Sequence, residues 1–303
     1  MTEPTAFISE DPMVASHSPP ELAVSAVNPA SLLRMGEDKP SRLAHWLATL
    51  GDPDFARWLA GFAPTHFYVG SEFCEHLLPS TNMLKKAVDH ARDLNLRIAL
   101  LTPIASPQVM RALADLLPCL PEGCEVVAND WGVAHFVKEH FPALRLAAGR
   151  ILCRMLKDPR LGQSNLPAQC DFDPAPLRPM FARLGFCRME IDVPLSVNSD
   201  TFSTLPMHTS VHVPFSCVAK GRMCRIGSLA LQGPERFAVG RKCRKECLKI
   251  SARLERPTAS DTFSAYQLGN TIVSRHSREA LGFVMSAVEQ GRINRLVVPG
   301  EAI

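Results

Sequence analysis

HFYVG (66–70), RIALL (97–101), EVVAN (125–129) and LRLAA (144–148) are four short apolar runs that follow one another along the chain. Amphipathic segments around 82–94, from Ser106 onward and around 131–140 separate them. Apolar runs of strand length that alternate with helices are typical of a parallel sheet covered on both faces. This stretch therefore predicts an α/β fold.

The same pattern continues, less regularly, toward the C-terminus. Further apolar runs are CRMEIDVPL (187–195), MHTSVHV (207–213) and RLVVP (295–299), and a helix is predicted over 278–291 before the last of them. Six or more such units in roughly 250 residues favour a TIM-like (β/α) barrel, closed or incomplete, over a small Rossmann domain. No glycine-rich phosphate-binding motif follows any of the runs, so a nucleotide site is not predicted.

Residues 1–40 differ from the rest of the chain. They hold six of the 25 prolines, a single aromatic residue and an acidic excess. This composition predicts a disordered N-terminal extension, followed by one barrel-like domain over 41–303 that contains the cysteines at 217–247. Apolar residues at helical spacing from Leu43 to Phe62 predict a helical hairpin, in which Trp46 and Trp58 either pack on the barrel or face a partner.

The overall composition is that of a globular chain. Its 303 residues are 46% hydrophobic and contain no apolar run of 18 residues, so we expect no transmembrane helix. The N-terminus lacks the pattern of a secretory signal, so we expect a cytoplasmic protein. A net charge of +3 is too small to indicate a nucleic-acid surface by itself.

Four of the ten cysteines, Cys217, Cys224, Cys243 and Cys247, lie within 31 residues and are flanked by arginines and lysines. Buried packing cysteines usually have apolar neighbours, whereas basic neighbours favour thiolates and offset the charge of a metal–thiolate centre. The spacers of six, eighteen and three residues are irregular for a zinc ribbon. An iron–sulfur cluster accepts more varied spacing, so this cysteine-rich segment is predicted to bind metal, with a 4Fe-4S cluster preferred to zinc or to chance clustering.

Several longer motifs carry a resemblance to a known family. They are VVANDWGVAHF (126–136), LRLAAGRILCRMLKDPR (144–160), RMEIDVPL (188–195), VHVPFSC (211–217) and GRMC (221–224). Together they resemble family 32 of the peptidases of unassigned mechanism, the collagenase-like proteins, over about residues 60–275. Within that family, FYVGSEFC (67–74) is similar to the first strand of the bacterial iron–sulfur proteins that work in pairs in oxygen-independent ubiquinone hydroxylation.

The resemblance implies a TIM-like barrel with a 4Fe-4S cluster, held in many members by cysteines that correspond to Cys217, Cys224, Cys243 and Cys247. In the similar ubiquinone protein, a cysteine at the place of Cys74 joins three of the later group. This sequence therefore has five candidates for four ligand positions. We rank Cys217, Cys243 and Cys247 first and then Cys224, with Cys74 as the alternative ligand. The five remaining cysteines, Cys119, Cys124, Cys153, Cys170 and Cys187, are expected to be packing thiols.

Polar residues that end or interrupt apolar runs are the other candidates, because chemistry in a barrel takes place at the carboxyl ends of the strands. They are Glu72, Asn129, Asp130, Arg150, Glu190, Asp192, His208 and His212. Glu190, Asp192 and His212 are the candidate catalytic residues. The two carboxylates point the same way on a strand and either act as a pair or bind Arg188 or Arg150. His208 and His212 share a strand face close to the cysteines, so one of them either contacts the cluster or substrate or has only a structural role. Asn129 and Asp130 fit a helix N-cap as well as they fit a substrate site.

Three classes of function remain open. The preferred one is an iron–sulfur protein in oxygen-independent hydroxylation, of a quinone precursor in ubiquinone biosynthesis or of an RNA base. The second is a collagenase-like peptidase, although no HExxH or GxSxG motif supports it. The third is a zinc-stabilised subunit without enzymatic activity. Because the chain has no flavin or nicotinamide motif, a cluster would need an external electron source, and we expect a related iron–sulfur subunit as the partner in a heterodimer.

Overall fold

The computed structural model describes residues 19–30, 38–153, 178–203, 205–221, 223–237, 243–254 and 264–301. Eight parallel strands close into a barrel in the order β1-β12-β7-β6-β5-β4-β3-β2. Their bounds are β1 Glu21–Ala26, β2 His66–Gly70, β3 Arg97–Leu101, β4 Glu125–Ala128, β5 Arg145–Ala148, β6 Phe186–Asp192, β7 Thr209–His212 and β12 Arg295–Pro299. The predicted TIM-like α/β barrel is therefore confirmed, and it is closed.

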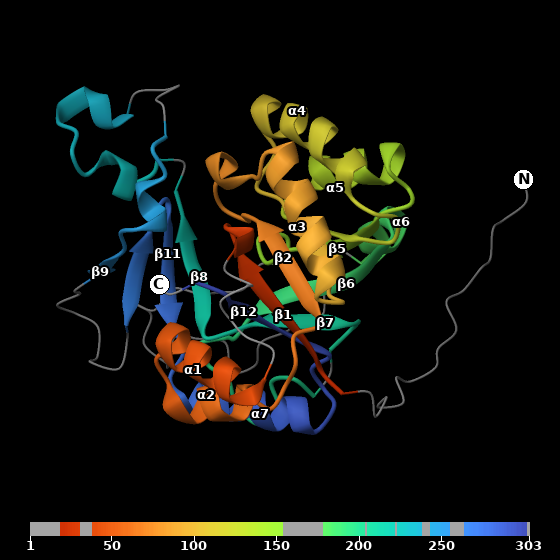
Figure 1. Cartoon of the computed structure of the whole chain (residues 1–303), viewed down its shortest axis with the longest axis vertical. Helices are drawn as coiled ribbons and strands as arrows, with labels where there is room; N and C mark the ends of the chain where they lie inside the picture. The colour runs from red at the N-terminus through yellow and green to blue at the C-terminus, as the bar shows by residue number, and fades with distance from the viewer. Residues whose placement is uncertain are drawn as a thin grey trace, which may run out of the picture.

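Helices cover the outside of this barrel (Figure 1). They are α1 Lys39–Leu50, α2 Pro53–Leu59, α3 Thr81–Asp93, α4 Pro107–Leu116, α5 Trp131–His140, α6 Arg178–Leu184 and α7 Arg278–Glu289. Local signals set several of their starts: Ser106 caps α4, and its Oγ accepts a hydrogen bond from the N–H of Val109 at 3.1 Å. Asp130 caps α5 in the same way. In the described part of the chain, no helix has the length and apolar character needed to cross a membrane.

A second, antiparallel sheet is inserted between β7 and α7. Its strands are β8 Phe215–Lys220, β9 Ala252–Leu254, β10 Ala265–Leu268 and β11 Thr271–Arg275, in the order β8-β11-β10-β9. Between β8 and β9 lie the short 3₁₀ helices η5 (Ile226–Ser228), η6 (Gly233–Phe237) and η7 (Glu246–Leu248). Two more 3₁₀ helices belong to the barrel: η2 (Glu75–Leu77) follows β2, and η3 (Leu117–Cys119) follows α4. Figure 1 shows this sheet beside the barrel. The cysteine-rich segment therefore belongs to the insertion.

One predicted boundary is wrong. Residues 21–26 were placed in a disordered extension, but they form β1, which pairs in parallel with both β12 and β2. Leu22 and Val24 on this strand are each 1% exposed. The segment is only six residues long, and the prolines on both sides of it gave it the composition of a disordered extension. The expectation for residues 1–18 and 31–37 concerns positions outside the described residues.

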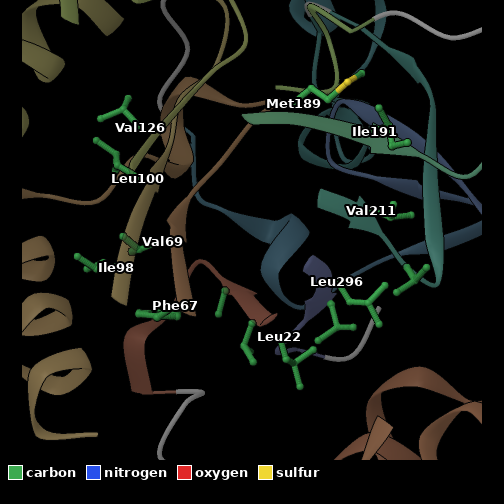
Figure 2. Close-up of a cluster of buried hydrophobic side chains, with 14 of the residues drawn as sticks. Leu22, Phe67, Val69, Ile98, Leu100, Val126, Met189, Ile191, Val211 and Leu296 are labelled. Carbon is green, nitrogen blue, oxygen red and sulfur yellow. The ribbon is translucent and has the colours of Figure 1, made fainter. Parts of the chain in front are cut away.

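The core has two layers, because successive side chains of each strand point to opposite faces of the barrel wall. Leu22, Phe67 and Val69 point outward and pack against the helices, in the apolar cluster that Figure 2 shows. Ala23 and Tyr68 belong to a separate, inner cluster, together with Ala99, Leu101, Val127, Ala147 and Val297. The small inner residues leave room inside the barrel for larger polar side chains.

The amino ends of the strands hold a buried polar network around Arg295, which is 1% exposed. Its guanidinium donates to Tyr68 Oη at 2.7 Å, to Glu125 Oε2 at 2.5 Å and to Glu21 Oε2 at 2.6 Å. It also donates to His66 Nε2 at 2.8 Å. Active sites of barrels lie at the carboxyl ends of the strands, so this network at the amino ends is part of the framework and not of the candidate site.

Candidate functional site

The carboxyl ends of the barrel strands, called here the barrel mouth, carry a buried ion cluster. Glu72 follows β2, Arg150 follows β5, and Asp192 ends β6. Arg150 donates through Nε to Glu72 Oε1 at 3.1 Å and through Nη2 to Glu72 Oε2, and its Nη1 donates to Asp192 Oδ1 at 2.7 Å. Burial alone would raise the pKa of Glu72, but the nearby Arg150 and His212 outweigh it and hold that pKa below its ordinary value.

A second pair lies beside this cluster inside the barrel. Glu190 on β6 is 0% exposed, and its Oε2 lies 2.8 Å from Nε2 of His212 on β7. Oε1 of Glu190 is buried and has no hydrogen-bond partner among the described residues. The ligand atoms of Glu72, Glu190 and His212 all lie within 4.8 Å of one another. The barrel mouth thus collects three carboxylates, one guanidinium and two imidazoles, because His276 also interacts with Asp192, Arg150 and His212.

Asn129 positions the loop that carries Arg150. Its Nδ2 donates to the carbonyl of Thr102 at 3.1 Å, and its Oδ1 accepts from the N–H of Ile151 at 3.0 Å. This side chain therefore ties the ends of β3, β4 and β5 together. A Cβ on Gly149 would lie only 2.3 Å from Asn129 Oδ1, so the loop requires glycine at that position.

Four cysteine side chains gather where the inserted sheet meets the barrel mouth. Cys74 follows β2, whereas Cys224, Cys243 and Cys247 come from the insertion. Burial raises the pKa of Cys74, and so do the neighbouring thiols of Cys243 and Cys224. Burial, followed by the same three neighbours, raises the pKa of Cys247 to about 11. These effects on the pKa values show that the four thiols are neighbours, although they are up to 173 residues apart in the sequence.

Cys74, Cys224, Cys243 and Cys247 are called here the thiol group. Backbone N–H groups and a glycine contact its sulfur atoms. The N–H of Gly227 donates to Cys224 Sγ at 3.2 Å, and the N–H of Lys245 donates to Cys243 Sγ at 3.4 Å. A Cβ on Gly269 would lie 3.4 Å from Cys247 Sγ and 3.8 Å from Cys224 Sγ, so the missing side chain leaves space beside both sulfur atoms.

Cys217, ranked among the first ligand candidates by sequence, lies in a different setting. It is buried on β8, where it pairs with Val273 of β11. Its thiol acts on the pKa of Arg150 and, together with the thiol of Cys74, on the pKa of Lys220. The thiols that act on the pKa of Cys247 are those of Cys224, Cys74 and Cys243, which places Cys74 with the cysteines of the insertion. Cys119, Cys124, Cys153 and Cys187 lie elsewhere in the fold, and Cys170 lies outside the described residues. None of the nine described cysteines forms a disulfide.

The segment 71–74 joins the ion cluster to the thiol group. Ser71 Oγ accepts from the N–H groups of Phe73 and Cys74 at 3.3 and 3.2 Å, which fixes the turn after β2. The guanidinium of Arg150 lies over the Phe73 ring, 5.2 Å from its centroid. Asn270, in the β10–β11 turn, donates to the carbonyl of Phe73 at 2.7 Å. The inserted sheet is thereby attached directly to the barrel mouth.

The structure brings together the three predicted candidates Glu190, Asp192 and His212. The two carboxylates share a face of β6, but they bind His212 and Arg150 respectively and not each other. His208 was expected near the cysteines; it lies at the opposite end of β7 instead, with its Nδ1 3.2 Å from Oδ1 of Asn294.

Two of the polar candidates have structural roles, and one pairing between candidates was not predicted. Asp130 is the N-cap of α5 and Asn129 is the loop anchor described above, which supports the structural alternative for both. Sequence reasoning named Glu72 and Arg150 but did not pair them, since they are 78 residues apart. The available signal was that each lies two residues beyond a barrel strand.

The two tryptophans of the helical hairpin pack on the molecule itself. Trp46 is 0% exposed and belongs to the main apolar core. Trp58 stacks on Phe55, and its Nε1 donates to Glu289 Oε1 at 2.9 Å. For this face, packing on the barrel is therefore the correct alternative.

Comparisons with known proteins give likenesses of fold. No family model matches the sequence, and no curated protein does either. The U32 peptidase Mk0906, a solved member of the family whose motifs the sequence resembles, is 13% identical, with a TM-score of 0.43 over 94% of each chain. The Group IV chitinase of Ostrinia furnacalis with allosamidin is 10% identical, with a TM-score of 0.35 over 92% of this chain and 91% of its own.

A dihydropteroate synthetase with a bound product is also 10% identical, with a TM-score of 0.35 over 93% of this chain and 88% of its own. At such identities the likeness concerns the fold alone, and the strand order already establishes that fold.

Proposed function

We propose that this chain is an iron–sulfur protein in oxygen-independent hydroxylation, with a 4Fe-4S cluster held by Cys74, Cys224, Cys243 and Cys247. The observation that carries the proposal is the gathering of these four thiols at the barrel mouth, where barrel enzymes have their active sites. The hydroxylation and its substrate, a quinone precursor in ubiquinone biosynthesis, rest on the motifs described above.

The residues present fit a cluster better than a single zinc ion. Tetrahedral zinc with Zn–S bonds of about 2.3 Å holds its sulfur atoms about 3.8 Å apart. Among the described cysteines, no three sulfur atoms lie within 4.8 Å of one another. A cubane attaches its four ligands to four different irons and so accepts this wider spacing. The N–H groups of Gly227 and Lys245 and the space beside Gly269 suit sulfur ligands that carry negative charge.

When bound, a 4Fe-4S cluster supplies a centre for one-electron transfer. The chain itself contributes the ion cluster, which begins at Glu72, two residues before Cys74. In this cluster, Glu72 and Asp192 hold the guanidinium of Arg150 over the ring of Phe73. Burial of Glu72, Arg150 and Asp192 limits the access of water to these groups.

A partner subunit is part of the proposal. Leu229 follows η5, while Leu248 ends η7 and Ile250 follows it; these apolar side chains are 62%, 46% and 47% exposed. They belong to the same part of the insertion as the thiols, since Cys224 precedes η5, Cys247 lies in η7, and η5 and η7 contact each other. Apolar residues next to a redox centre suit a docking partner that exchanges electrons, which we assign to a related iron–sulfur subunit.

The peptidase alternative gains no support from the site. Ser216 and His276 are the nearest approach to a nucleophile and base, with Oγ and Nε2 2.7 Å apart. However, the Ser216 hydroxyl donates to the carbonyl of Val193 at 3.0 Å, and the other ring nitrogen of His276 has no partner among the described residues. A histidine that acts as a base is normally oriented through that second nitrogen.

The test is anaerobic purification followed by iron and acid-labile sulfide analysis. We expect brown protein with about four irons per chain. Cys74→Ser and Cys247→Ser should lose the cluster, whereas Cys119→Ser, in η3 after α4, should retain it. Colourless protein with stoichiometric zinc would overturn the proposal. Cys217→Ser distinguishes the two possible ligand sets, in which either Cys74 or Cys217 is the fourth ligand. Loss of iron in Cys217→Ser together with its retention in Cys74→Ser would mean that Cys217 is the ligand, as the sequence predicts.

The partner and the reaction need their own measurements. Tagged protein purified anaerobically from its own host should bring down a near-equimolar related chain, identified by mass spectrometry. Leu248→Ser should weaken this association without lowering the iron content. Recovery of a monomer that still supports hydroxylation of the quinone precursor would contradict the need for a partner.

A further inference from the structure

The barrel mouth contains a second group of potential metal ligands, which lies inside the barrel. Glu72, Glu190 and His212 come from the ends of β2, β6 and β7, and are 4%, 0% and 6% exposed. One ligand atom from each lies within 4.8 Å of the other two. None of these residues is a cysteine of the thiol group, and none has a role in holding the proposed cluster.

The charges in this place are unbalanced. Three buried carboxylates, those of Glu72, Glu190 and Asp192, face the single guanidinium of Arg150. Arg150 pairs with Glu72 and Asp192, so the carboxylate of Glu190 has only the imidazole of His212 as its neighbour in hydrogen-bond contact. Buried carboxylates normally require a paired charge or a metal ion, because removing them from water is costly.

An unpartnered atom points to a ligand. Oε1 of Glu190 is completely buried and accepts no hydrogen bond among the described residues, although Oε2 of the same carboxylate is satisfied. Leaving a buried acceptor unsatisfied is unfavourable, and such atoms in native structures often mark an ion or a water. A cation bound beside Glu190 would satisfy this oxygen and offset the excess negative charge together.

We propose that Glu72, Glu190 and His212 bind one divalent cation of the Mn²⁺ class inside the barrel. Two carboxylates and one imidazole form a hard, oxygen-rich ligand set, which favours such an ion over those preferred by thiolates. Each carboxylate oxygen has a second lone pair, so Glu72 can bind the ion while it keeps its bonds to Arg150. Arg150 then acts as the outer group that fixes the orientation of a ligand carboxylate.

The probe is MnCl₂, because Mn²⁺ prefers oxygen and nitrogen ligands and binds the sulfur atoms of the thiol group only weakly. Full-length protein, purified anaerobically and treated with EDTA, is titrated with MnCl₂ while the EPR signal of free Mn²⁺ is recorded. We expect saturable binding of one Mn²⁺ per chain and a rise in Tm on saturation. Absence of saturable binding, or binding without any change in Tm, would overturn the proposal.

Glu190→Gln is the decisive variant, since glutamine keeps the shape of the side chain and a hydrogen bond to His212 while removing the charge. It should weaken Mn²⁺ binding at least tenfold and abolish the rise in Tm. Glu125→Gln is the matched control, because Glu125 is also buried, at the opposite end of the barrel, and should bind Mn²⁺ as wild type does. Equal affinity in Glu190→Gln and wild type would refute the assignment.

A further pair of variants makes the result independent of the proposed cluster. His212→Gln should reduce Mn²⁺ affinity in the same way and replaces Glu190→Gln if that protein does not fold. Cys243→Ser removes a member of the thiol group and should leave Mn²⁺ binding intact. Loss of Mn²⁺ binding in Cys243→Ser would mean that the ion binds at the thiols, and it would overturn the proposed site.

Discussion

Replacement of His66 by glutamine should change how the stability of the barrel depends on pH. Nε2 of His66 accepts a hydrogen bond from Arg295 at 2.8 Å, so its proton lies on Nδ1, 2.8 Å from the Oγ1 of Thr65. This arrangement requires a neutral ring. Burial, and then the charge of Arg295, lower the pKa of His66 from 6.5 to about 4.

The sign and size of the effect follow from this shift. The unfolded chain binds a proton at His66 near pH 6.5, but the folded chain binds it only near pH 4. Stability from this group is therefore complete above pH 6.5 and is lost as the pH falls toward 4. Between pH 7 and pH 5, His66 alone should remove about 2 kcal/mol from the free energy of unfolding.

The assay is urea unfolding at pH 7 and pH 5. Wild type should lose about 2 kcal/mol more than His66→Gln over this interval, whatever the stability of the variant at pH 7. His208→Gln is the control, because it removes an exposed histidine and keeps the contact between His66 and Arg295. An equal loss in wild type and His66→Gln would refute the buried neutral ring.

Five other substitutions test the framework of the fold and of the site by urea unfolding. Gly149→Ala forces a Cβ to within 2.3 Å of the asparagine that anchors the loop and should cost about 1–3 kcal/mol, whereas Gly282→Ala on α7 meets open space and should gain about 0.5–1 kcal/mol. Arg150→Met leaves two buried carboxylates without their cation and should cost about 3–5 kcal/mol. Ser106→Ala removes the cap of α4 and should cost about 1 kcal/mol. Leu22→Ala should cost about 2–5 kcal/mol if β1 belongs to the barrel, and a loss below 0.5 kcal/mol would contradict that.

Much of the barrel could be predicted because its signals are local. The apolar runs from HFYVG to RLVVP correspond to strands of the barrel, and the Ser106-Pro107 start of α4 is where it was predicted. β1 escaped prediction for a physical reason. Its six residues gain their stability from parallel pairing with β2 and β12, which are 40 or more residues away, and nothing in the local composition reports that pairing.

The candidate site was predictable in kind but not in arrangement. Barrel geometry indicates that Glu72, Arg150 and Asp192 lie at one end, because all three follow or end barrel strands. It does not say which carboxylate takes the guanidinium. That choice depends on side-chain reach across the barrel, and it leaves Glu190 to His212.

The cysteines show the same limit more sharply. Cys217, Cys224, Cys243 and Cys247 are close in sequence, and closeness favours Cys217 as a ligand. In the fold, however, β8 continues for three residues beyond Cys217 before the chain turns toward Cys224, so Cys217 stays in the sheet that packs on the barrel. Cys74 reaches the other thiols from the opposite direction, because Ser71 turns the chain after β2 and Asn270 binds the carbonyl next to Cys74. Which thiol completes the group is therefore decided by how the inserted sheet docks on the barrel, a long-range contact that spacing along the chain does not encode.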